Sequence, residues 1–77
     1  MVSATADITV HIDETLDHEK LATVAERLRQ SSGIASVEFH DKKPHFLLVR
    51  YDSSKLTSND IHRLVTEQGV HAEMIGL

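Results

Sequence analysis

Residues 8–21, ITVHIDETLDHEKL, decide the fold of this chain, because a strand pattern changes here into a helix pattern within a few residues. Ile8, Val10 and Ile12 alternate with polar residues, which is the period of a strand with one buried face. From Leu21 onward the apolar residues recur at intervals of three and four, as on one side of an amphipathic helix: Leu21, Val24, Ala25 and Leu28. The stretch therefore predicts a strand, a short loop and a helix.

The helix has clear start and stop signals. Asp17 can act as its N-cap, because a carboxylate there accepts a free amide of the first turn. Leu16 and Leu21 flank this cap with the spacing of a hydrophobic staple. Residues 31–33, Ser-Ser-Gly, are suited to ending the helix.

The middle of the chain predicts a β-hairpin. In the first of its strands Ala35, Val37 and Phe39 alternate with polar residues. Residues 40–45 form a polar turn that includes Pro44, since proline lacks the amide hydrogen that a central strand needs. Residues 46–51 form the next strand.

A second helix and a fourth strand follow. Thr57 is the expected N-cap of the helix, and its buried stripe consists of Ile61, Leu64 and Val65. Gly69 suits the left-handed position after the helix, and residues 70–75 alternate as a strand with Val70, Ala72 and Met74 on one side.

The resulting order, β-α-β-β-α-β, predicts an α+β ferredoxin-like fold. Right-handed crossovers leave one compact solution for this order. It is a two-layer sandwich with a four-stranded antiparallel sheet, in strand order 4-1-3-2, and two helices on one face. Residues 1–77 are expected to form a single domain.

Composition excludes several classes of function. A net charge of −4 argues against nucleic acid as a partner, and no apolar run is long enough for membrane insertion. With no cysteine, the chain has no thiol for disulfides, catalysis or metal binding. Neither an assembled nucleophile nor a glycine-rich phosphate loop is present, so we expect no enzyme. The first residues show no secretory signal, which predicts a cytoplasmic protein.

The six histidines are the unusual feature of the composition. In the predicted topology five of them lie at one edge of the sheet, and His62 lies at the opposite edge: His11, His18, His40, His45 and His71. His11 and His71 lie on neighbouring strands and face the open side of the sheet, so they could share a ligand. Imidazole with carboxylate suits a divalent transition metal ion: zinc, nickel, cobalt or copper(II).

The predicted metal ligands are therefore His11 and His71, helped by His18, Glu14 or Asp17. Two simpler interpretations stand beside this one. The histidines can be unrelated, solvated side chains at turns. Glu14 and Asp17 can serve the cap and the dipole of the first helix.

The open face of the sheet predicts a contact surface. If Leu47, Val49 and Tyr51 face the helices, Phe46 and Leu48 point the other way, and Ile75 joins them from the fourth strand. An apolar patch of this kind suits a protein partner or self-association. The alternatives are a scatter of exposed apolar residues, or a shifted register that buries Phe46 and Leu48.

Residues 7–76 resemble a heavy-metal-associated domain, the small module of copper chaperones and metal-transporting ATPases. Four segments carry the resemblance: 8–12, 33–39, 48–52 and 68–76. It implies the ferredoxin-like fold, metal handling and transient contact with a partner protein.

The metal motif of that family is missing from this sequence. Family members carry Met-x-Cys-x-x-Cys in the first loop, and a gapless alignment places Ile12, Glu14 and Asp17 at the methionine and the two cysteines. Carboxylates are hard donors, so this loop does not suit copper(I). Either histidine and carboxylate donors have replaced the cysteines for a divalent ion, or the module has lost its metal and acts as an adaptor.

Overall fold

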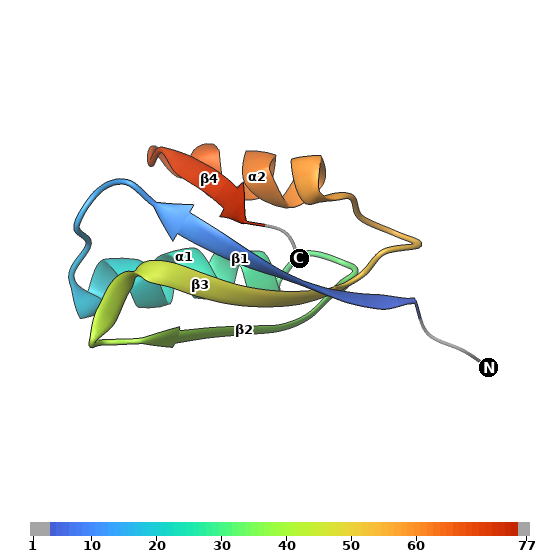
Figure 1. Cartoon of the computed structure of the whole chain (residues 1–77), viewed down its shortest axis with the longest axis horizontal. Helices are drawn as coiled ribbons and strands as arrows, with labels where there is room; N and C mark the ends of the chain where they lie inside the picture. Colours follow the sequence, from blue (N-terminus) through green and yellow to red (C-terminus); the bar gives the residue numbers. More distant parts are fainter. Residues whose placement is uncertain (1–3, 76–77) are drawn as a thin grey trace.

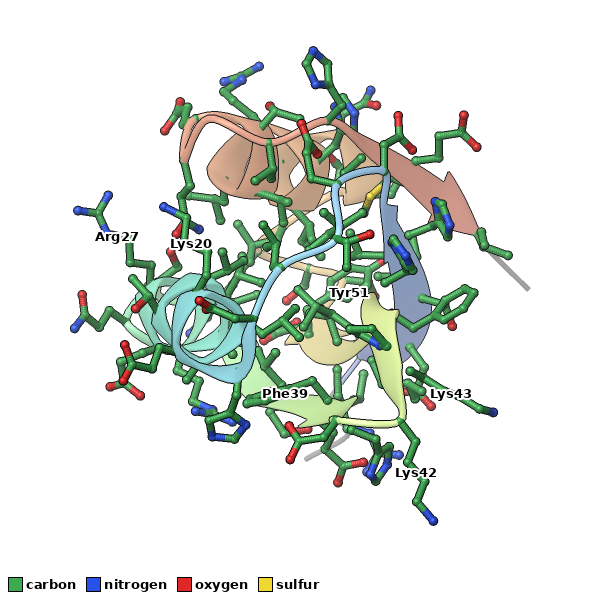
Figure 2. All side chains as sticks on the ribbon, turned by 90° about the vertical axis from the view of Figure 1, so that its left-hand side faces the viewer. Lys20, Arg27, Phe39, Lys42, Lys43 and Tyr51 are labelled. Carbon is green, nitrogen blue, oxygen red and sulfur yellow. The ribbon has the colours of Figure 1, made fainter. Side chains whose placement is uncertain are left out.

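The computed structural model describes residues 4–75, which form the predicted order of strands and helices (Figure 1). The elements are β1 Thr5–Ile12, α1 His18–Arg29, β2 Ile34–His40, β3 Lys43–Asp52, α2 Ser58–Thr66 and β4 Ala72–Ile75. The antiparallel sheet has the order β2-β3-β1-β4, as predicted. Figure 2 shows both helices on the same side of this sheet. The resemblance extended to Gly76, which lies outside the described residues.

The hydrophobic core fills the space between the sheet and the helices. Ile8, Val10 and Ile12 of β1 are buried, as the alternation predicted. The other buried residues of the core come from both helices, β2, β3 and the segment before β4: Leu21, Val24, Ala25, Leu28, Val37, Leu47, Val49, Tyr51, Ile61, Val65 and Val70. None of the helices within residues 4–75 is long and apolar enough to cross a membrane.

Both helices begin as the sequence predicted. The carboxylate of Asp17 accepts a hydrogen bond from the backbone amide of Lys20 at 2.8 Å. Thr57 caps α2, and Asp60 bonds back to the Thr57 amide, which completes a capping box. Gly69 has the expected positive φ, 88°.

The hairpin between β2 and β3 is tighter than predicted, and the assignment of Pro44 to the turn is wrong. Strand β3 already begins at Lys43, so Pro44 lies inside it and the turn consists of residues 41–42. The reason is an irregularity in the ladder: Phe39 is opposite Leu47, whereas His40 is opposite Lys43. Pro44 lies within this irregular stretch and before the segment that pairs with β1, where a missing amide hydrogen costs little.

Two other strand predictions need correction. Ala35 is exposed, because a register shift between Ile34 and Ser36 interrupts the expected alternation in β2. Strand β4 begins at Ala72, two residues later than predicted. The backbone amide of His71 donates to the side chain of Glu14, so the ladder with β1 stops there.

The topology gathers three connections at one edge of the molecule, which we call the loop edge. It consists of the β1–α1 loop (residues 13–17), the β2–β3 turn (41–42) and the segment before β4 (69–71). This edge lies at the left of Figure 1 and faces the viewer in Figure 2. The β3–α2 loop, residues 53–57, lies at the opposite edge.

Candidate functional site

Three histidines from different parts of the chain make hydrogen bonds in or beside the β1–α1 loop. His71 precedes β4, His45 belongs to β3, and His18 is the first residue of α1. Each uses its Nδ1 atom to contact an oxygen of another segment of the loop edge. Histidines that bind metals usually have one ring nitrogen engaged in this way, which leaves the other for the ion.

The contact between Glu14 and His71 is the closest approach among the predicted ligands. The backbone N–H of His71 donates to Oε1 of Glu14, and the Nδ1–H donates to Oε2, both at 2.8 Å. These hydrogen bonds lower the pKa of Glu14 and raise the pKa of His71. Because the His71 side chain is 83% exposed, its Nε2 atom is accessible from solvent.

His18 lies elsewhere on the loop edge. Its Nδ1–H donates to Oδ1 of Asp41 at 2.6 Å, and its ring lies against Phe39 with centroids 5.6 Å apart. The hydrogen bond and the negative charge of Asp41 raise the pKa of His18. This contact joins the start of α1 to the β2–β3 turn, on the side of the sheet away from β4. Asp41 was not among the predicted site residues.

His45 has a role that the sequence analysis did not assign. Its Nδ1–H donates to the carbonyl oxygen of Ile12 at 2.8 Å, and its Nε2 lies 3.4 Å from the hydroxyl of Thr15. The first contact is a hydrogen bond of ordinary length, and the second is longer and weaker. His45 therefore bridges the end of β1 and the middle of the loop. Sequence position alone put it at the right edge, but only the pairing of β3 with β1 reveals these contacts.

His11 faces the open side of the sheet, as predicted. Its ring stacks on His45 with centroids 5.7 Å apart, and it meets Phe46 edge-on at 5.2 Å. Its Nδ1 lies 3.4 Å from Oδ1 of Asp13, two residues further along the chain. The residue directly opposite His11 on β4 is Glu73 and not His71.

The structure thus brings Glu14 and His71 together and leaves the other predicted ligands apart. Asp17 is engaged as the cap of α1. Within residues 4–75, no group of three His, Cys, Asp or Glu side chains lies close enough to hold a metal ion. The predicted ligands therefore share an edge of the molecule without converging on one point.

His62 lies nearer this edge than the sequence analysis predicted. Its Nε2–H donates to the carbonyl oxygen of Ala72 at 2.9 Å, and Ala72 pairs with Ile12 at the end of β1. The prediction of the opposite edge was wrong, because α2 has only nine residues and β4 only four, so a side chain halfway along the helix reaches the first residue of the strand.

The loop does not suit copper(I). The two residues at the cysteine positions of the resembled family are Glu14 and Asp17, and their carboxylates accept hydrogen bonds from His71 and Lys20. A soft ion prefers sulfur donors, which this sequence lacks. Imidazoles at the loop edge instead suit borderline divalent ions.

The open face of the sheet carries the predicted apolar patch. Phe46 is 38% exposed, Leu48 50% and Ile75 45%. Leu48 and Ile75 lie opposite Thr9 on its two sides, and Phe46 lies opposite His11, so the patch crosses three strands. Arg50 and Asp7 form an ion pair at 2.9 Å on the same face. The shifted register that would bury Phe46 and Leu48 is excluded.

Comparison with solved structures identifies proteins of the same fold. Oxidized MerP from Ralstonia metallidurans CH34 matches with a TM-score of 0.82 and 15% identity, over 92% of this chain and 97% of that one. The copper transporter domain of yeast matches with a TM-score of 0.81 and 15% identity, over 92% and 96%. The first domain of the human copper chaperone for SOD1 matches with a TM-score of 0.78 and 21% identity, over 94% of each chain.

These likenesses confirm the predicted resemblance at the level of the fold. No protein-family model matches the chain. A search of curated protein sequences finds no match either.

Proposed function

We propose that this chain is a small metal-binding module that holds a divalent transition ion at the loop edge. The observation that carries the proposal is the gathering of five histidines and several carboxylates at the edge formed by the β1–α1 loop. Zinc, nickel, cobalt and copper(II) are the ions that accept such donors. Solved proteins of the same fold include the copper transporter domain of yeast and the human copper chaperone named above.

In this proposal His71 and His11 are the lead ligands. Glu14 holds the Nδ1–H of His71 and so orients the exposed Nε2 toward an incoming ion, an arrangement common at zinc sites. His18 has the same arrangement with Asp41, at a separate point of the edge. Asp17 contributes by keeping α1, and with it the loop, in place.

The proposed role is to carry an ion rather than to catalyse a reaction. The imidazoles of His18 and His71 at the loop edge are exposed, so an ion bound there stays accessible to a second protein. Transfer between proteins needs this access, whereas catalysis usually takes place in an enclosed cleft. A partner protein that receives or delivers the ion is therefore part of the proposal, and so is a cytoplasmic location.

Isothermal titration calorimetry with zinc, nickel, cobalt and copper(II) chlorides tests the proposal. We expect one ion per chain for at least one metal, and a loss of about tenfold or more in affinity in His71→Ala and in His11→Ala. The matched control is His40→Ala, which removes an exposed imidazole from the end of β2. No heat of binding with any of the four metals, or equal affinities in all variants, contradicts the proposal.

The apolar patch supports a second candidate, an adaptor or dimerisation module that docks through Phe46, Leu48 and Ile75. Its support is that three large apolar side chains are exposed next to one another. Sedimentation of the wild type and of Phe46→Ser tests this candidate. We expect a dimer, or a complex with a captured partner, that the substitution weakens. A monomer at high concentration that retains no partner contradicts it.

A further inference from the structure

The gap between His11 and Asp13 is too long for a hydrogen bond. Their Nδ1 and Oδ1 atoms are 3.4 Å apart, whereas N–H···O hydrogen bonds span about 2.7–3.2 Å. Two ligands of one tetrahedral zinc ion, each about 2.0–2.2 Å from the metal, are about 3.4 Å from each other. These two atoms form a loose ion pair, and their spacing leaves room for both to contact one metal ion without moving apart.

The other histidine–carboxylate pairs of the loop edge do not have this spacing. His71 and Glu14 are 2.8 Å apart, and His18 and Asp41 are 2.6 Å apart. Both distances are those of charge-assisted hydrogen bonds. An ion cannot lie between the nitrogen and the oxygen of either pair unless they separate.

The His11 side chain is also fixed in position by its neighbours. Its ring lies between the stacked ring of His45 and the edge of Phe46, and His45 is itself hydrogen-bonded to the end of β1. A ligand that is already oriented loses little conformational freedom when the ion binds.

Strand β4 and the residue before it supply two further donors beside this pair. Glu73 is directly opposite His11, and the amide of Asp13 donates to the carbonyl of His71 at 2.8 Å, so His71 lies beside Asp13. Directly opposite residues have Cβ atoms about 4.5–5.5 Å apart, and diagonal neighbours are about 7–8 Å apart, within reach of long side chains. Two imidazoles and two carboxylates therefore occupy adjacent positions on two paired strands.

We propose that His11 and Asp13 form the nucleus of a zinc-type site on the open face of the sheet, which Glu73 and His71 complete. This inference rests on the proposed function and names its ligand set, including two carboxylates that the sequence analysis did not select. Their two negative charges balance a divalent cation. Residues 4–75 contain no assembled group of three such donors, so the exposed side chains of Glu73 and His71 have to move toward the pair when the ion binds. His71 offers its Nε2 atom, because its Nδ1 donates to Glu14.

The test combines zinc calorimetry with cobalt(II) absorption spectra of the whole chain. Asp13→Asn and Glu73→Gln are expected to weaken zinc binding about tenfold or more each. Matched controls are Glu67→Gln, an exposed carboxylate that follows α2, and Glu38→Gln, an exposed glutamate of the same face. Both controls should bind like the wild type. Cobalt(II) should show the intense visible bands of a tetrahedral site in the wild type and lose them in Asp13→Asn.

The outcomes separate this inference from the proposed function. If zinc binds and His71→Ala weakens it while Asp13→Asn and Glu73→Gln do not, the metal-binding function stands and this ligand set is wrong. If the controls weaken binding as much as the two test variants, binding is diffuse attraction to negative charge and the inference also fails. If neither ion binds, both proposals fail. All four substitutions are at exposed side chains, so folding is expected to survive them and circular dichroism checks this.

Discussion

The loops that lead into the two helices are built differently, although the helices begin in the same way. Each helix has a capping side chain, Asp17 or Thr57, and a buried apolar residue four positions later. The β3–α2 loop is held without histidine: Asp52 accepts two hydrogen bonds from Ser54, and Ser53 donates to the backbone carbonyl of Ala4. The β1–α1 loop is instead held by histidines from other parts of the chain.

The contacts that hold the two loops respond to different ranges of pH. In the β3–α2 connection, hydrogen bonds from Ser54 lower the pKa of Asp52, and those from Thr57 lower the pKa of Asp60, so these contacts change only in acid. The contacts of His18 and His71 change instead as pH rises through pKa values that their carboxylate partners hold above 6.5. The β3–α2 loop shows that a β–α loop of this fold can be held without imidazoles, so holding the loop does not by itself require the histidines of the loop edge.

The largest expected effect tests whether the two helices contribute equally to the core. Leu21 is 1% exposed and Ile61 is fully buried, and each occupies the fourth position of its helix. Leu21→Ala and Ile61→Ala should each lower the free energy of unfolding by about 2–5 kcal/mol, measured by urea denaturation. Leu48→Ala, at a 50% exposed position, is the control and should change stability little. A small loss at only one helix would show that the two helices differ in their packing against the sheet.

Alanine substitutions at the glycines that follow the two helices should cost unequal amounts of stability. Gly33 and Gly69 have φ angles of 98° and 88°, so alanine at either site is strained by about 1–2 kcal/mol. At Gly33 the new methyl group would also lie 3.1 Å from Leu56, whereas nothing lies within 4 Å at Gly69. Thermal unfolding of Gly33→Ala should therefore show the larger loss. Equal losses would mean that the Leu56 side chain moves aside without cost.

Removing the caps separates stability from metal binding. Asp17→Ala and Thr57→Ala should each cost about 0.5–2 kcal/mol of unfolding free energy, because each leaves an amide of the first helical turn without a partner. Asp17→Asn retains a capping side chain and should cost much less. Zinc calorimetry on Asp17→Ala should give wild-type affinity if this carboxylate only caps the helix. If Asp17→Ala folds but gives no heat of zinc binding, Asp17 is a metal ligand, which is the role that the sequence analysis predicted for it.

The smallest expected effect is a pH dependence that belongs to the β1–α1 loop alone. The pKa values of His18 and His71 are raised above 6.5, so their ion pairs stabilise the fold fully below that pH and less as pH rises through the raised values. The pKa of Glu14 is lowered below 4.5, so its contribution is present above that pH and is lost as pH falls through the lowered value.

Thermal midpoints from pH 5.5 to 8.5 measure this effect. The wild type should lose slightly more stability over this range than the double variant His18→Gln/His71→Gln, and 1 M salt should reduce the difference, because the pairs are exposed. Asp52→Asn, in the other loop, should leave the slope unchanged in this range. If the thermal midpoint of the double variant depends on pH as steeply as that of the wild type, other groups are responsible for the pH dependence.

Most of the fold could be predicted from the sequence, because local patterns carry it. The period of two placed Leu47, Val49 and Tyr51 inside and Phe46 and Leu48 outside, and the structure confirms this. The caps at Asp17 and Thr57 were also predictable, since a cap and the amides that it binds are only a few residues apart. The errors at Pro44 and Ala35 came from register shifts between β2 and β3, which no single strand reveals.

For the candidate site, the sequence by itself determined which strand-end residues reach the loop edge, because topology assigns each strand end to an edge. It misplaced His62, which lies in a helix. Only the tertiary structure decided which of them meet. His71 bonds to Glu14, His45 reaches Ile12 and Thr15, and Glu73 is opposite His11. These contacts depend on the register between β1 and its neighbours, and a shift of one residue turns every side chain to the other face. That register is set by packing of the whole core and not by any local pattern.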